Sequence, residues 1–111
     1  MSVSVVQLLA AKFAENAQTA QYTSTSVTTK VSKCTVANQS GVSATIAINI
    51  VPSGGAAGAS NLRLPTRTIL AGEVYNCPEI VGTVLPSGAF ISTLAGTASA
   101  LVIQMEGLLI T

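Results

Sequence analysis

The stretch that decides the fold runs from Thr83 to Thr111 and reads TVLPSGAFISTLAGTASALVIQMEGLLIT. Apolar side chains stand at every second position in Leu101, Ile103 and Met105, and a mixed set stands between them. Successive side chains of a β-strand point to opposite faces, so this spacing predicts a strand with one apolar face. Such a strand needs a second sheet to cover it. We therefore predict an all-β protein whose earlier strands supply that sheet.

Turn residues divide the rest of this stretch. Leu85-Pro86-Ser87-Gly88 predicts a hairpin turn, because proline and glycine set turn geometry. A strand is expected over residues 90–94, and Gly96 opens the turn that leads into the alternating strand. Gly107 predicts a bend before a short terminal strand over residues 108–110.

The middle of the chain predicts further strands. The threonine-rich residues 19–33 favour two strand segments around a Ser/Thr turn. The turn signal Asn38-Gln39-Ser40-Gly41 separates two alternating runs and predicts a hairpin, with the isoleucines of residues 46–50 on one face. The small residues of 52–61 predict a flexible surface loop that could lie flat against a partner.

Residues 62–80 contain the signs of a sheet edge. Pro65 predicts an edge strand or a break, because proline cannot donate to the ladder. Arg63 and Arg67 are interpreted as strand-edge or rim charges, because two arginines without a basic patch argue against a nucleic-acid partner. Ala71-Gly72 predicts a tight turn before a short strand over residues 74–77.

The N-terminal residues 1–16 are ambiguous. Alanines favour a helix and valines favour a strand, and we interpret the segment as an extended N-terminal arm or first strand. The remaining residues 17–111 form the predicted β-sandwich domain, Ig-like or jelly-roll. An arm of this kind could reach onto a neighbouring subunit.

The composition argues for a subunit rather than an enzyme. The chain is 49% hydrophobic and only 8% charged, with a net charge of +1, so we expect neighbouring protein to cover much of its surface, as in a homo-oligomer. It has no histidine and no aspartate, which removes the commonest general base and zinc ligand. We predict that the protein is not an enzyme and has no catalytic, cofactor-binding or metal-binding residues.

Two further features place the protein in its compartment. Cys34 and Cys77 are too few for a disulfide scaffold and are expected as small buried hydrophobes inside strands, although a bridge between facing strands stays open. No run reaches the ~20 apolar residues that span a bilayer, and Lys12 follows rather than precedes the first apolar stretch. We expect no membrane partner and synthesis in the cytoplasm.

Several motifs resemble a group of small structural proteins of tailed bacteriophages. They are the strand start at Tyr22-Thr23, the turn at Asn38, VPSGG at residues 51–55, AGE at 71–73, CPEIVG at 77–82 and FISTLAGTASAL at 90–101. The resemblance covers residues 17–111, and its last third is the most specific. Related sequences end in a more polar strand, with a basic residue before the last glycine. Gln104 to Leu109 is more acidic and more apolar here, so partner contacts at that end are expected to differ.

The resemblance implies a virion structural protein with no catalytic residues. We expect a capsid decoration or cement protein that binds and stabilises the major capsid shell, made in the host cytoplasm and located in the virion. A neck or tail adaptor, collar or ring component is the alternative, because sequence separates these positions poorly. A carbohydrate- or receptor-binding module is the third possibility, although the chain lacks the tryptophan that usually stacks on sugar rings.

Overall fold

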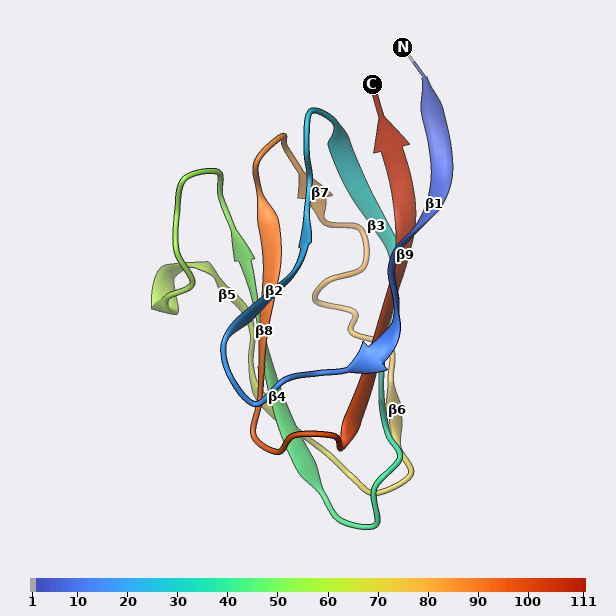
Figure 1. The fold of residues 1–111 in the computed structure, drawn as a ribbon, viewed down its shortest axis with the longest axis vertical. Helices are drawn as coiled ribbons and strands as arrows, with labels where there is room; N and C mark the ends of the chain where they lie inside the picture. The colour runs from blue at the N-terminus through green and yellow to red at the C-terminus, as the bar shows by residue number, and fades with distance from the viewer. Residues whose placement is uncertain (1) are drawn as a thin grey trace.

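The computed structural model describes residues 2–111, which form an all-β sandwich (Figure 1). In chain order its elements are β1 (Val3–Phe13), β2 (Thr19–Thr23), β3 (Thr28–Asn38), β4 (Ala44–Val51), the 3-10 turn η1 (Ala59–Asn61), β5 (Leu62–Ile69), β6 (Val74–Tyr75), β7 (Val84–Leu85), β8 (Phe90–Ala95) and β9 (Leu101–Ile110). The predicted fold class is therefore confirmed.

The strands form two antiparallel sheets. Sheet I has the order β1-β9-β3, with β6 and β7 both pairing with the far side of β3; sheet II has the order β2-β8-β4-β5. The pairs are nested along the chain: β1 with β9, β2 with β8, β3 with β6 and β7, and β4 with β5. An antiparallel ribbon of nested pairs, folded so that alternate pairs fall in opposite sheets, is a jelly roll. Of the two sandwiches expected from the sequence, the connectivity is that of the jelly roll.

The core lies between the inner faces of the two sheets. Leu101, Ile103 and Met105 of β9 are fully buried there, as the alternation predicted. Ile46 and Ile48 of β4 are fully buried in the same cluster. Burying each side chain of this size contributes about 1.5–3 kcal/mol, so the inner faces of these two strands carry a large part of the stability.

The predicted hairpin around residues 38–41 is wrong. The turn exists, but β3 lies in sheet I and β4 lies in sheet II, so the chain crosses between layers instead of folding back on one sheet. Each strand takes its partners from distant sequence: β3 pairs with β9, and β4 pairs with β8. A turn signal reports a reversal of direction and carries no information on which sheet the next strand joins.

The same correction applies near the C-terminus. Residues 85–88 do turn, with Ala89 N donating to Pro86 O over 3.0 Å, but they connect β7 in sheet I to β8 in sheet II. The predicted bend at Gly107 is also wrong, because β9 runs unbroken to Ile110. A Cβ at Gly107 would collide with the Lys30 carbonyl oxygen on β3 and with the Leu8 side chain. This glycine permits a close approach between strands.

Other expectations are resolved by the two sheets. The N-terminal segment is strand β1, the outer strand of sheet I, so residues 3–13 belong to the sandwich. Pro65 lies in β5 at the edge of sheet II, as predicted. The short strand expected over 74–77 is confined to Val74–Tyr75.

The small-residue loop is folded back rather than free. Asn61 Oδ1 accepts hydrogen bonds from Gly58 N at 3.1 Å and from Asn49 Nδ2 at 2.8 Å, and Asn61 Nδ2 donates to Ala56 O at 2.9 Å. The loop thereby buries Asn49, whose exposed fraction is 5%. Residues 52–61 form a surface loop, as predicted, and two asparagines supply the hydrogen bonds that the small residues lack.

Candidate interaction surface

The described residues lack the usual elements of a chemical site. Within residues 2–111 there is no group of three or more His, Cys, Asp or Glu side chains that could hold a metal ion, and no pocket. The charged and polar side chains instead form small clusters that join the two sheets. Because these clusters hold the most conspicuous polar residues in structural contacts, the outer faces of the two sheets are the remaining candidates for a functional surface.

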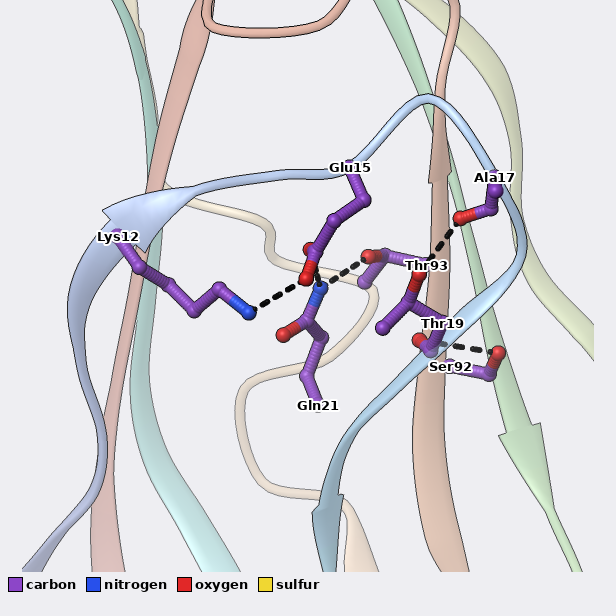
Figure 2. Close-up of polar contacts among 7 residues, drawn as sticks. All are labelled: Lys12, Glu15, Ala17, Thr19, Gln21, Ser92 and Thr93. Atoms are coloured by element: carbon purple, nitrogen blue, oxygen red, sulfur yellow. Dashed lines mark hydrogen bonds and ion pairs between the residues drawn. The ribbon is translucent and has the colours of Figure 1, made fainter.

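One polar cluster fixes the crossing from β1 to β2 (Figure 2). Lys12 Nζ lies 2.7 Å from Glu15 Oε2, while Gln21 Nε2 donates to Glu15 Oε1 at 2.9 Å and to Thr93 Oγ1 at 2.9 Å. The hydrogen bonds from Lys12 and Gln21 lower the pKa of Glu15 below its usual value. A single ionised carboxylate without a second acid or an imidazole has no partner for general acid–base work, so this cluster is structural.

A second cluster closes the side of the sandwich where β5 and β6 meet. Arg67 of β5 lies over the Tyr75 ring of β6, 4.0 Å from its centroid. The Tyr75 hydroxyl donates to the Glu79 carboxylate, at 2.5 Å from Oε1 and 2.7 Å from Oε2. Partial burial, and then the hydrogen bond to Glu79, raise the pKa of Tyr75 to about 12. Arg67 is thus a strand-edge charge, as the sequence suggested, and it joins sheet II to sheet I.

This cluster gives a pH prediction. We expect tyrosinate absorbance to show a late step near pH 12, from Tyr75, well above the ordinary value of 10.0. Because the folded-state pKa is raised, the stability from this contact is complete below pH about 10 and is lost as pH rises toward 12. Tyr75→Phe should remove the late step and Glu79→Gln should move it to lower pH, whereas Tyr22→Phe should leave it in place. A late step that survives in Tyr75→Phe would contradict the assignment.

The two cysteines are free and fully buried. Cys34 lies on β3, as expected, but Cys77 lies in the turn after β6 with a φ of 44°. Contact with Cys77, and then burial, raise the pKa of the Cys34 thiol above its ordinary value. A buried protonated thiol is a poor nucleophile, so the pair packs the core and offers no reactive group.

The outer face of sheet I carries a continuous apolar row. The register places Phe13 opposite Val102, Val102 opposite Ala37, and Ala37 opposite Val74, so one row crosses β1, β9, β3 and β6. Phe13 is 45% exposed and Val74 is 58% exposed, while the two residues between them are half-buried. We call Phe13, Val102, Ala37 and Val74 the apolar row.

The other end of the same face carries three apolar side chains and one lysine. Val5 lies opposite Leu108, Leu108 opposite Lys30, and Lys30 opposite Val84. Val5 is 82% exposed and Val84 is 55% exposed. Between this end and the apolar row lies a polar band, listed from β1 to β3 as Gln7, Glu106, Gln104, Lys33 and Thr35.

The outer face of sheet II is less open. The loop of residues 52–61 lies over it, and Val51 of β4 is fully buried although it stands outside the core cluster. A Cβ added at Gly55 would lie 3.3 Å from the Val51 side chain, so the loop passes close to Val51 at this glycine. Two large apolar side chains stay exposed on this face, Leu94 of β8 at 39% and Leu62 of β5, which lies opposite Asn49, at 38%. The outer face of sheet I is therefore the better candidate for a contact surface.

The sequence predicted no site residues, and it did not single out the apolar row. Its four members come from four strands that are distant along the chain. The alternation of β9 did place Val102 on the face opposite the core, but the neighbours of Val102 on that face depend on the strand order. The low overall charge was the one signal that pointed to a covered surface.

Within residues 2–111 no helix has the length and apolar character needed to cross a membrane. Comparisons of the chain with protein-family models, with curated proteins and with solved structures gave no match.

Proposed function

We propose that this protein is a structural component of a tailed-bacteriophage virion, and that it decorates or cements the capsid by lying against the shell with the outer face of sheet I. The observation that carries the proposal is the apolar row, which leaves Phe13 and Val74 about half exposed. In a chain with 8% charged residues, apolar side chains aligned across a sheet face mark a surface that another protein covers.

Three further observations support this proposal. The motifs between Tyr22 and Leu101 resemble those of phage structural proteins. The jelly roll occurs in viral capsid proteins and also in lectins, so the fold agrees with a virion role without assigning one. The clusters at Glu15 and Tyr75 hold the two sheets together, which suits a rigid part that works by contact.

A position in the neck or tail, as an adaptor, collar or ring, would use the same kind of surface. The number of copies per particle separates the two positions. A cement protein is present in numbers comparable to the shell subunits, whereas a ring contains only a few copies. A sugar-binding role is supported by the fold alone, because the chain has no tryptophan and Arg67 covers the Tyr75 ring.

Quantitative mass spectrometry of virions purified from the phage that encodes the chain tests the virion role. We expect the protein in purified particles at a copy number comparable to that of the shell protein. A copy number fit for a single ring would place it in the neck or tail instead. Absence from particles, with the protein present in the infected cell, would overturn the virion role.

A binding experiment tests the surface itself. Val74→Glu places a charge in the apolar row, and we expect it to weaken binding to shells that lack the protein by at least about tenfold, or roughly 1.4 kcal/mol. Leu94→Glu makes the same change at an exposed leucine on the outer face of sheet II and should bind as the parent protein does. Equal binding by the parent and Val74→Glu, or a loss confined to Leu94→Glu, would assign the contact to another face.

A further inference from the structure

Three of the four sheet edges in residues 2–111 carry features that discourage pairing with another strand. β5 contains Pro65 together with Arg63 and Arg67. β2 has five residues and an irregular register between Ala20 and Tyr22, and the edge of sheet I beyond β3 consists of two strands of two residues each. Proline, charge, irregularity and short length are the usual protections of an exposed edge.

The first half of β1 has none of these protections. Residues 3–7 pair with β9 in unbroken register, and the first charged residue of the chain is Lys12. Val3 and Val5 are 56% and 82% exposed. In Figure 1 this half of β1 runs along the outer margin of sheet I with no strand beyond it.

The hydrogen-bond pattern shows which backbone groups are left open on this edge. Ser2 and Thr111 exchange both backbone hydrogen bonds, Ser2 N to Thr111 O at 3.1 Å and Thr111 N to Ser2 O at 2.9 Å. Bonded and non-bonded pairs alternate in an antiparallel ladder, so Ser4 and Val6 also bond to β9. The N–H and C=O groups of Val3, Val5 and Gln7 therefore point away from β9 toward the open edge.

We propose that this edge pairs with the same edge of a second copy of the chain, antiparallel about a two-fold axis at Val5. In that register Val5 lies opposite Val5 of the second copy and Val3 lies opposite Gln7, so all three residues satisfy their open backbone groups. An antiparallel edge is complementary to itself under a two-fold rotation, and neither copy brings a charge to the contact between residues 3 and 7.

The pairing would also extend one row of the outer face. Val5 lies in one row with Leu108, Lys30 and Val84, and pairing at Val5 would continue that row into the second copy at its apolar end. The register shift between Gln7 and Leu9 then ends the contact, because a bulge bends the strand away from flat pairing. The contact is short, below the usual size of a stable interface, so we expect a dissociation constant on the order of micromolar or weaker.

The inference does not rest on the virion role, because it concerns the purified protein alone. Sedimentation equilibrium from about 1 µM to about 1 mM should show a reversible monomer–dimer equilibrium. Val5→Pro removes the N–H that points to the open edge and leaves the β1–β9 ladder intact, so dimerisation should weaken at least tenfold while the thermal transition stays in place. Val5→Lys, which sets two like charges at the axis, should do the same.

Two controls separate backbone pairing from general stickiness. Val5→Thr keeps the β-branched shape and the N–H, so it should dimerise within a few-fold of the parent. Val74→Glu alters the apolar row away from this edge and should dimerise normally even if it fails to bind shells. The proposal is overturned if the parent protein stays monomeric up to about 1 mM, a result that would leave the edge to a strand of another protein. It is also overturned if Val5→Pro does not weaken the dimer, or if Val74→Glu abolishes it.

Discussion

Gly107→Ala should lower the free energy of unfolding by about 3 kcal/mol and the melting temperature by roughly 10–20 °C. The added Cβ would collide with the Lys30 carbonyl oxygen on β3 and with the Leu8 side chain. Lys30 belongs to the ladder that joins β3 to β9, so relief requires the two central strands of sheet I to separate. Differential scanning calorimetry of the purified variant measures the shift directly.

Gly41→Ala is the matched control. It makes the same substitution at a glycine in the turn between β3 and β4, where an added Cβ meets no atom within 4 Å. Its change in stability should stay within about 0.5 kcal/mol. If the two variants had the same melting temperature, the close approach of β3 to β9 would not be what requires a glycine at position 107.

Asn38→Ala should destabilise the protein by about 2–4 kcal/mol, the second large effect expected. Asn38 is 2% exposed, and its Nδ2 donates to Val42 O at 2.8 Å and to Ile69 O at 2.9 Å. Its Oδ1 accepts from Ser40 N at 2.9 Å. The side chain thus fixes the crossing from sheet I to sheet II and ties it to the end of β5. Its removal takes a donor from the carbonyl of Ile69, a residue that is fully buried and out of reach of water.

Urea denaturation, followed by circular dichroism, measures this loss as a lower midpoint. Gln39→Ala is the neighbouring control, because Gln39 is exposed and makes one side-chain bond, to Ser99 O at 3.2 Å. It should change stability by no more than about 0.5 kcal/mol. Asn38→Asp keeps the acceptor for Ser40 but loses both donors, so it should be destabilised as well. A stable Asn38→Asp protein would show that the donors to Val42 and Ile69 matter little.

Much of the strand content followed from local pattern. The alternation of Leu101, Ile103 and Met105 indicated which face of β9 is buried, and Pro65 indicated an edge strand. These signals are local because a strand exposes alternate faces whatever its partners are, and because proline lacks its donor in any sheet. The turn at Asn38 was predicted for the same reason, although the hairpin that it suggested was wrong.

The candidate surface needed the strand order. Phe13, Val102, Ala37 and Val74 form one row because β1, β9, β3 and β6 lie side by side. The open backbone groups of Val3, Val5 and Gln7 likewise follow from the register of β1 on β9. No local pattern carries this information, since the pairing between β1 and β9 joins the two ends of the chain.

The sequence by itself determined that the chain folds as strands, which of their faces are buried, and that histidine and aspartate chemistry is absent. The tertiary structure alone decided that the turns at residues 38–41 and 85–88 cross between sheets, that Gly107 admits a close backbone contact, and which surfaces stay open. The physical reason is that side-chain alternation is a property of one strand, whereas pairing depends on hydrogen bonds between segments far apart along the chain.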